Sequence, residues 1–237
     1  MIDDSELRDL DPFDLLDAEA RRLEGFFATL DGEDWLRPTR CAGWRRRELL
    51  AHLAAGEAYN RATIDGSLQD FLAAGTAAGA TDLASFNDWG VRVRAERTPE
   101  ELLDEWRAAC ARNRHDLREL GWDGTLQTAG AGPYPAGRQA LHLAQEFAIH
   151  ADDMGVPVAD GERRLRGEWQ ARFARFTVRE YGRDVEVVSD GAGMNTVRAA
   201  GLVVGVDDER LVDACSARLP GDAPVPEPVR DLLRVFA

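Results

Sequence analysis

Lysine is absent from this chain of 237 residues, so all 29 basic side chains are arginines. Without lysine, the chain lacks the amine that forms Schiff bases with carbonyl substrates or pyridoxal cofactors. Walker-type phosphate loops and protein-kinase nucleotide sites also require a lysine, so both classes are excluded. Because arginine stays protonated, proton transfer falls to the carboxylates, the cysteines, the tyrosines or the 4 histidines.

Cysteine is scarce, and its three residues are far apart with no CxxC pair: Cys41, Cys110 and Cys215. An odd, dispersed set is not typical of a disulfide framework and fits a reducing compartment. The first residues, Met1–Asp4, lack the basic and apolar regions of a signal peptide. Apolar runs of about 18 residues, the length of a membrane span, are missing as well. These absences predict a cytoplasmic protein that does not contact a membrane.

Positive charge is in the minority, because 43 Asp and Glu face 29 arginines and give a net charge of −14. A chain of this charge repels phosphate backbones, so we expect no nucleic-acid partner. The densest basic run, Arg45–Arg47, has the ordinary interpretation of arginines that solvate the start of a helix. The 44 % of hydrophobic residues, with 6 Trp among them, suffice for a buried core.

The first two thirds of the chain show amphipathic helical periodicity. Thr98–Glu101 combines a capping box with proline at the first helical position, and Gly121 is a matching stop. We expect helices over residues 12–30, 44–64, 68–74, 99–120 and 136–154, loops over 75–79 and 130–135, and leave 83–94 undecided. Four of these helices are long, which predicts an antiparallel four-helix bundle.

The rest of the chain has a different pattern. Val185–Val188 and Ala200–Val204 are typical of strands, and Asp190–Gly193 between them is typical of a turn. Residues 208–217 and 228–236 have the pattern of short helices. The predicted fold class is therefore α+β, mainly α, with the bundle followed by a small α/β C-terminal domain. We place the two domains at residues 1–160 and 161–237.

The most informative segment for chemistry is the helix that contains His142, Glu146, His150 and Asp153. Helical geometry places Glu146 and His150 about 40° apart on one face, with Asp153 about 20° to the other side of Glu146. A carboxylate and an imidazole at this spacing can bind one ion, and Asp153 can accept the hydrogen of the second ring nitrogen. His142 lies about 12 Å from His150, so one ion binds His142 and Glu146 or Glu146 and His150, not both histidines. Only the second pair has a supporting carboxylate downstream.

A third ligand has to come from another helix, and His52 in the apolar segment Leu49–Ala55 is the candidate. Side chains on facing helices of a bundle are an established source of metal sites. The alternative is a metal-free bundle in which these polar residues satisfy one another in the core. The remaining histidine, His115, lies among charged neighbours, and we expect it to be solvated.

Two motifs resemble those of the mycothiol-dependent maleylpyruvate isomerase family. The first covers residues 40–54 and contains the family's Gly-Trp, a short charged run and the letters LLAHLA. The second is an acidic residue, three others, His, two others and Asp, and it is matched by Glu146, His150 and Asp153. Residues 97–103 between the motifs are also similar to the family. The resemblance covers residues 10–157 well and the tail loosely.

This resemblance implies a DinB-like metal-binding four-helix bundle with a smaller α/β C-terminal domain. It implies a divalent metal ion, usually zinc (Zn2+), held by His52, Glu146 and His150. It also implies mycothiol, the low-molecular-weight thiol of actinobacteria, as thiol cofactor or co-substrate, in agreement with the arginine-only composition. In the tail, Arg218 resembles a family arginine that can bind a substrate carboxylate, with Ala217 in place of the glycine before it.

The implied chemistry is the attack of a thiol on a small electrophilic substrate. Three protein ligands leave an open position on the ion, and a thiol bound there is favoured as thiolate. The thiolate either adds to a double bond, allows rotation and leaves, as a maleylpyruvate-type cis–trans isomerase requires, or displaces a leaving group and stays attached, as an S-transferase requires. The replacement at Ala217 favours S-transfer.

Four further residues are expected to line the substrate pocket: Trp44, Asn87, Trp89 and Tyr134. We expect a monomer or a homodimer. The rival function is a non-catalytic bundle that binds a metal or small ligand and acts by regulation or sequestration. Both functions begin with the same three ligand residues, so the ligands alone do not separate them.

Overall fold

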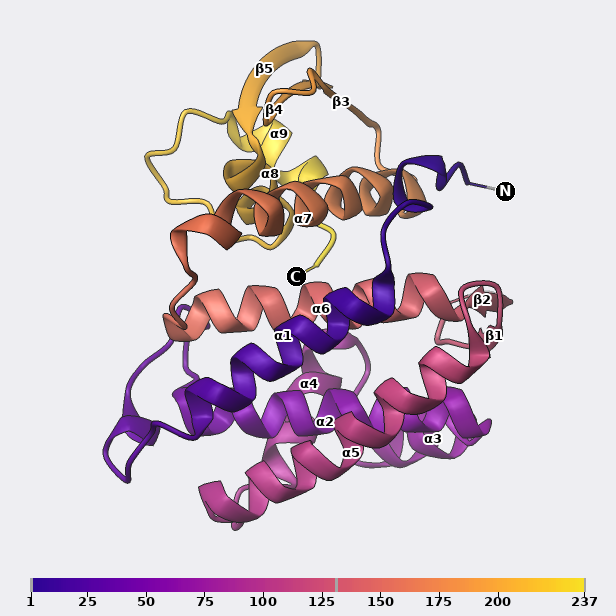
Figure 1. The fold of residues 1–237 in the computed structure, drawn as a ribbon, viewed down its shortest axis with the longest axis vertical. Coiled ribbons are helices and arrows are strands. Elements are labelled where there is room, and N and C mark those ends of the chain that lie inside the picture. The colour runs from indigo at the N-terminus through magenta and orange to yellow at the C-terminus, as the bar shows by residue number, and fades with distance from the viewer. Residues whose placement is uncertain (1, 131, 237) are drawn as a thin grey trace. The chain divides into compact units, whose positions relative to one another are not determined.

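A computed structural model describes residues 2–130 and 132–236 of the chain (Figure 1). Two expectations include residues that the structure does not describe. Met1 belongs to the N-terminal segment compared with a signal peptide, and Ala131 belongs to the loop expected at 130–135. Within the described ranges, every helix is too short or too polar to cross a membrane.

The chain divides into two compact units, Pro12–Val156 and Met1–Asp11 together with Pro157–Ala237. The domain division expected from the sequence, at residues 1–160 and 161–237, stays a prediction. The first unit is helical with one short hairpin. Its elements are α1 (Pro12–Phe27), η2 (Asp34–Leu36), α2 (Arg46–Asp65), α3 (Leu68–Ala77), α4 (Leu83–Arg92), α5 (Pro99–Leu120), β1 (Thr125–Gln127), β2 (Pro133–Pro135) and α6 (Ala136–Met154).

Local signals determine where the long helices begin and end. Thr98 Oγ1 accepts a hydrogen bond from the Glu101 amide at 3.2 Å, and the Glu101 carboxylate accepts one from the Thr98 amide at 2.8 Å. This is the expected capping box at the start of α5. α6 ends at Gly155, whose φ of +73° is a left-handed conformation that glycine adopts without strain. With α1, α2, α5 and α6 as a bundle, the predicted α+β, mainly α class is confirmed.

The bundle places the middle of α2 beside the second half of α6. Two contacts along each pair of helices show that the pair is antiparallel. α1 and α5 are joined by Arg107–Glu24 and Arg114–Asp17, and α2 and α6 by His52–Glu146 and Gln139–Asn60. The bundle core is aromatic, since the buried Trp106 ring lies 5.5 Å from the Phe27 ring and 5.8 Å from the Phe147 ring, centroid to centroid. Packing of these large rings fixes the helices on which the polar residues of the site are carried.

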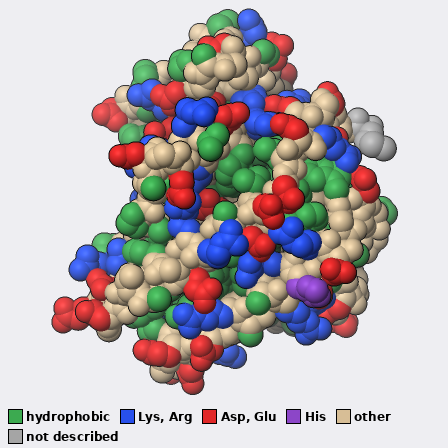
Figure 2. Space-filling model, in the orientation of Figure 1, with side chains coloured by type: hydrophobic (Ala, Val, Ile, Leu, Met, Phe, Trp, Pro, Cys, Tyr) green, Lys and Arg blue, Asp and Glu red, His purple; other side chains and the backbone are tan. Residues whose placement is uncertain are grey.

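Arginine and acidic side chains are interspersed over the face shown in Figure 2. In the run Arg45–Arg47, Arg46 Nη2 donates to the Met154 carbonyl at 3.2 Å, and Arg47 Nη2 donates to the Arg97 carbonyl at 2.7 Å. The Met154 carbonyl belongs to the last turn of α6, where cationic side chains stabilise a helix. Two of the three arginines in this run therefore bind backbone carbonyls of the bundle.

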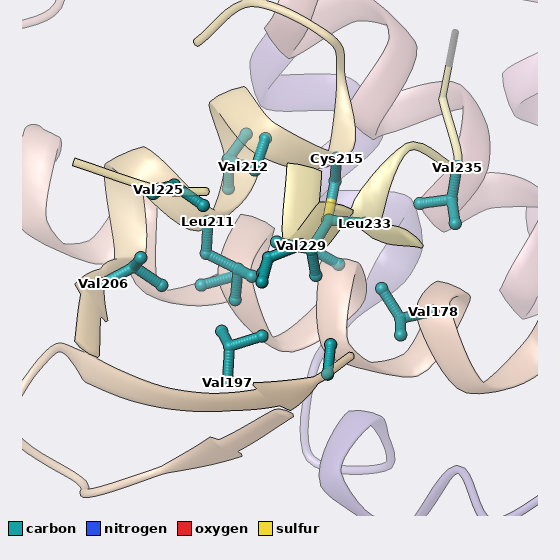
Figure 3. Packing of buried hydrophobic residues seen from close by; sticks show 14 residues of the cluster. Val178, Val197, Val206, Leu211, Val212, Cys215, Val225, Val229, Leu233 and Val235 are labelled. Atoms are coloured by element: carbon teal, nitrogen blue, oxygen red, sulfur yellow. The ribbon is translucent and has the colours of Figure 1, made fainter. Parts of the chain in front are cut away.

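The second unit contains a small sheet and helices that pack on it. Its elements are η1 (Ser5–Leu7), α7 (Asp160–Glu180), β3 (Val185–Ser189), β4 (Met194–Ala199), β5 (Leu202–Asp207), α8 (Asp208–Cys215) and α9 (Glu227–Leu233). The strands form an antiparallel sheet in the order β3-β4-β5, with Val187 opposite Val197 and Val197 opposite Val204. Figure 3 shows Val197 and Val206 of this sheet in one buried cluster with Leu211 of α8 and Val229 of α9.

The largest difference from the sequence expectation is α7, because no helix was expected over residues 160–180. Its buried positions include Arg166 and Arg175 beside Trp169, so charged residues interrupt the apolar period on the inward side. The middle strand β4 was also missing from the expectation. Its buried residues alternate as a strand requires, but the first of them is the polar Asn195.

Three smaller corrections concern loops and strand ends. The loop expected at 75–79 begins later, since α3 continues to Ala77, and Gly75 serves close packing because a Cβ there would lie 2.2 Å from the Phe86 ring. The loop expected at 130–135 contains β2, in which Tyr134 pairs with Leu126 of β1. The strand expected from Ala200 begins at Leu202, because the two residues before it form a tight turn.

Candidate metal centre

Two of the expected ligands lie one helical turn apart on α6. Glu146 Oε1 is 3.1 Å from His150 Nε2. The His150 side chain is 7 % exposed, whereas the Glu146 side chain is 38 % exposed. Burial holds the histidine in one orientation, and the carboxylate beside it still reaches solvent.

The third expected ligand reaches the same carboxylate oxygen from α2. His52 Nε2 lies 2.8 Å from Glu146 Oε1, although the two residues are 94 positions apart in the sequence. The His52 and His150 ring centroids are 4.9 Å apart, and the ring planes are nearly perpendicular at 84°. One nitrogen from each histidine and one carboxylate oxygen thus lie within 4.8 Å of one another.

Asp153 contacts the other nitrogen of the His150 ring. Its Oδ2 lies 2.9 Å from His150 Nδ1, and its side chain is fully buried. A carboxylate in this position holds a ring hydrogen on Nδ1 and leaves Nε2 facing Glu146, where Nε2 donates a hydrogen bond when the ring is protonated and offers its lone pair to a cation when the ring is neutral. The three-residue spacing of the two side chains on one helix predicts this contact.

The site combines a buried histidine and a partly exposed carboxylate, two groups of opposite charge. Burial disfavours the charged forms of both Glu146 and His150, but their mutual attraction and their hydrogen bonds outweigh it. The pKa of Glu146 therefore lies well below its usual range, and the pKa of His150 lies well above its usual range. The centre holds an ionised carboxylate that requires a positive partner, which is either a proton on the imidazole or a metal cation.

The donor set fits one divalent cation. Two imidazole nitrogens and one carboxylate oxygen are ligands that zinc accepts, at about 2.0–2.2 Å each. The spacings of 2.8 and 3.1 Å between Glu146 Oε1 and the two nitrogens are close to those of neighbouring ligands around a single ion. Three protein ligands are also the number that leaves a position for a further group.

The alternative pairing of His142 with Glu146 receives no support from the geometry. His142 Nε2 lies 3.0 Å from the Tyr134 hydroxyl oxygen, and the two ring centroids are 5.8 Å apart. Among the described residues, the groups of three ligand atoms within 4.8 Å do not include His142. Tyr134, one of the expected pocket residues, is therefore a neighbour of His142, one helical turn before Glu146.

The other expected pocket residues differ in their surroundings. Trp44 contacts the candidate centre, since its ring centroid is 5.0 Å from that of His52. Trp89 on α4 packs against Phe71 at 5.4 Å, and Asn87 lies half-buried on the same helix. That these residues line a substrate pocket stays a prediction.

Arg218 lies in the second unit, shortly after α8. Its Nη1 donates to the Ser216 carbonyl at 2.5 Å. The residue before it, Ala217, has a φ of +56°, a left-handed conformation that usually requires glycine. Ala217 thus adopts the left-handed conformation at the position where the family has glycine. The role of Arg218 toward a substrate carboxylate stays a prediction.

Cys41 also lies at this site, although no spacing in the sequence predicts it there. Cys41 Sγ lies 3.1 Å from Asp153 Oδ2 and 3.8 Å from His150 Nδ1. These three atoms form a second group within 4.8 Å that shares His150 with the first. The sequence feature that could have indicated this place is that Cys41 lies in the first motif, three residues before Trp44.

Comparison with known proteins finds a family model and solved structures that match the chain. The family model described as "Mycothiol maleylpyruvate isomerase N-terminal domain" matches residues 16–155. No curated protein matches the chain. Crystal structures of the mycothiol-dependent maleylpyruvate isomerase and of its H52A mutant each have a TM-score of 0.61 and 17 % identity, with 92 % of this chain and 94 % of the other covered.

At that identity the solved structures show a common fold and nothing finer. The family model is the stronger finding, because it matches more than half of the chain and includes both motifs. Its range contains all three candidate ligands, His52, Glu146 and His150. The chain therefore belongs to the mycothiol maleylpyruvate isomerase N-terminal domain family.

Proposed function

We propose that this protein is a divalent-metal-dependent enzyme that uses a low-molecular-weight thiol, mycothiol, as nucleophile toward a small electrophilic substrate. The observation that carries the proposal is the convergence of ligand atoms from His52, Glu146 and His150 within 4.8 Å. Family membership supports mycothiol, and the mixed nitrogen and oxygen donors support zinc as the ion. The cytoplasm, where a small thiol stays reduced, is the proposed location.

Each residue of the centre has a separate task. A bound divalent ion supplies Lewis-acid chemistry that favours the thiolate form of the thiol. Asp153 holds the hydrogen on Nδ1 of His150 and so directs Nε2 toward the position of the ion. Glu146 supplies negative charge and, being 38 % exposed, leaves the centre open to solvent and therefore to reactants.

The proposed reaction is a nucleophilic attack by sulfur, in one of two forms. In cis–trans isomerisation the sulfur adds to an activated double bond, the single bond rotates, and the thiol leaves unchanged. In S-transfer the sulfur displaces a leaving group, which departs with the electron pair of its broken bond to carbon, and the new carbon–sulfur bond persists. Arg218 is the proposed partner of a substrate carboxylate, by its resemblance to the family arginine. Recovery of free thiol with a rearranged substrate identifies the first form, and a thioether product identifies the second.

Elemental analysis of the full chain, purified without chelator, tests the metal centre. We expect about one divalent ion per chain, since three converging ligands bind one ion. His52→Ala and His150→Ala should each abolish retention of the ion while the helical circular dichroism stays near that of the wild type. His142→Ala is the matched control, because it removes a histidine from the same helix outside the ligand group, and it should retain the ion. Retention of the ion by both ligand variants would show that the ligands are wrongly assigned.

Titration calorimetry with mycothiol, followed by incubation with a panel of electrophiles, tests the enzyme. We expect heat of binding with mycothiol for the metal-loaded chain and none for His52→Ala. Formation of a thioether or of a geometric isomer, followed by mass spectrometry and absorbance, supports catalysis. Binding of mycothiol without turnover of any electrophile would instead support the sequestering protein, and absence of binding to any thiol would refute the proposal.

A further inference from the structure

Cys41 sits in a turn that hydrogen bonds hold in a single conformation. The Cys41 amide donates to Thr39 Oγ1 at 3.1 Å, and Thr39 Oγ1 donates to the Trp44 carbonyl at 2.9 Å. The Trp44 amide donates back to the Cys41 carbonyl at 3.1 Å, which closes the turn. Gly43 has a φ of +83°, so the turn requires a residue without a Cβ at that position. These hydrogen bonds hold the backbone from which the Cys41 side chain projects.

The turn is attached directly to the end of α6. The amide of Arg40 donates to the backbone carbonyl of Asp153 at 3.0 Å, and Pro38 and Arg45 close the segment by an isolated bridge. From this anchor the Cys41 thiol donates to Asp153 Oδ2 at 3.1 Å. Trp44, at the other end of the turn, places its ring 5.0 Å from that of His52. One short turn thus contacts residues on both sides of the candidate metal centre.

Two donors meet at one oxygen of Asp153. His150 Nδ1 lies 2.9 Å from Oδ2 and Cys41 Sγ lies 3.1 Å from the same atom. The Asp153 side chain is fully buried while the thiol is in place, so in the intact protein the thiol supplies a hydrogen bond to Oδ2 that solvent does not supply. A carboxylate held by two donors from different segments has less freedom to turn away from the imidazole than one held by a single donor.

We propose that Cys41 is a positioning residue of the metal centre: its thiol donates to Asp153 Oδ2 and thereby keeps that carboxylate aligned with His150 Nδ1. This inference rests on the proposed metal-dependent function. Cys41 acts through Asp153, and Asp153 acts on His150, so the thiol determines how firmly His150 Nε2 is directed at the ion. The alternative use of the same three atoms is a second, thiolate-containing metal site, in which Cys41 binds an ion itself.

Cobalt(II) titration of the full-length protein separates these roles, because cobalt reports coordination by its visible absorption. Loss of an outer hydrogen-bond partner of a ligand weakens metal binding by about 10- to 100-fold. We expect Asp153→Asn to weaken cobalt binding by about 10- to 100-fold. Cys41→Ala and Cys41→Val, which remove the thiol donor, should weaken cobalt binding by about tenfold. Cys41→Ser retains a donor and should restore the affinity to within about twofold.

A double variant tests whether Cys41 acts through Asp153. If it does, adding Cys41→Ala to Asp153→Asn should weaken cobalt binding no further, whereas independent effects would multiply. Cys215→Ala, which removes a buried thiol from the other unit, is the matched control and should bind cobalt as the wild type does. Circular dichroism and the melting temperature of every variant show that the fold is kept.

Four results would overturn the inference. The first is that the wild type, Cys41→Ala and Cys41→Val bind cobalt with equal affinity, and the second is that Cys41→Ser does not restore the affinity. The third is that the losses of the two single variants multiply in the double variant. The fourth is that a second equivalent of cobalt binds with a thiolate charge-transfer band that Cys41→Ser abolishes. Absence of any cobalt binding by the wild type would refute the proposed function itself. That result is distinguishable, because the positioning inference fails alone only when the wild type binds cobalt.

Discussion

Glu57 is a carboxyl group in the bundle core that the proposed reaction does not use. Both Glu57 and its neighbour Asn113 are fully buried, and Asn113 Nδ2 donates to Glu57 Oε2 at 2.6 Å. Glu57 Oε1 and Asn113 Oδ1 are buried acceptors that lack a hydrogen-bond partner within the described part of the chain. Burial raises the pKa of Glu57 to about 7, against the opposing effects of Asn113, Cys110 and Arg114 on α5. In its protonated form Glu57 carries a hydroxyl donor in place of one of these acceptor oxygens.

The raised pKa of Glu57 predicts a stability that falls as the pH rises. The group titrates near 4.5 in the unfolded chain and near 7 in the folded one, so the folded state binds the extra proton between these values. The stabilising effect of this proton is complete below pH 4.5 and is lost as the pH rises to 7, a change of roughly 3 kcal/mol. Glu57→Gln mimics the protonated form at every pH. In urea unfolding, the free energy of unfolding of Glu57→Gln relative to that of the wild type should be higher at pH 8 than at pH 5. The same relative free energy at both pH values would contradict the raised pKa.

At the scale of elements, the turn between β4 and β5 carries a removable strain. Ala199 pairs with Leu202, so Ala200 and Gly201 form a two-residue loop with φ values of +52° and +74°. Positive φ at both positions is the type I′ geometry, which Asn-Gly favours and in which a β-carbon other than that of Asn or Asp is costly. Ala200→Asn should therefore raise the free energy of unfolding by about 0.5–1 kcal/mol.

Thermal denaturation of the full chain checks this turn. The matched control is Gly201→Ala, which places a second β-carbon at positive φ and should lower the stability by about 1 kcal/mol. Equal stability of Ala200→Asn and the wild type would mean that the turn relaxes to a conformation without strain.

The same scale shows which elements can be predicted from sequence. The helix α5 has its predicted bounds because its start is specified by contacts between Thr98 and Glu101, three residues apart. In α7 the inward residue Arg175 instead binds Glu6 at 3.0 Å and Asn195 at 2.8 Å, partners far away in the sequence. A buried, paired arginine counts as polar in a periodicity pattern, so the buried face of α7 does not show the apolar period of an amphipathic helix. Local signals such as a capping box predict a helix, whereas burial of charged side chains that pair with distant residues prevents its prediction.

The candidate centre divides in the same way. Helical spacing predicts that Glu146, His150 and Asp153 share a face, because one helix places all three. His52 is 94 residues away from Glu146, so helical spacing does not link it to them, and its place in an apolar helical segment together with the family resemblance makes it the candidate. Cys41 is 112 residues away from Asp153 in a turn with no periodicity, so neither spacing nor composition marks it as a neighbour. Its place depends on tertiary contacts that the sequence does not reveal by itself.

At the scale of the whole molecule, the candidate ligands are confined to one of the two compact units. His52, Glu146 and His150, with Asp153 and Cys41, all lie within Pro12–Val156. An ion that binds only the folded form stabilises the elements that supply its ligands, by about 2.7 kcal/mol at a free concentration of 100 times its dissociation constant. Chelation of the full-length protein should therefore increase amide hydrogen exchange in α2 and α6. Exchange in β3, β4 and β5 should change little.

Hydrogen exchange with mass spectrometry measures both regions in one sample, so the sheet serves as the internal reference. The His52→Ala variant is the control for nonspecific effects of the chelator, because it lacks a ligand and should show rapid exchange in α6 with or without chelator. An equal increase of exchange in both units of the wild type would mean that the ion stabilises the chain as one cooperative body. An unchanged pattern would mean that the ion does not bind between α2 and α6. The expected result, a local increase in the wild type that is absent in His52→Ala, ties the ion to the contact between these two helices.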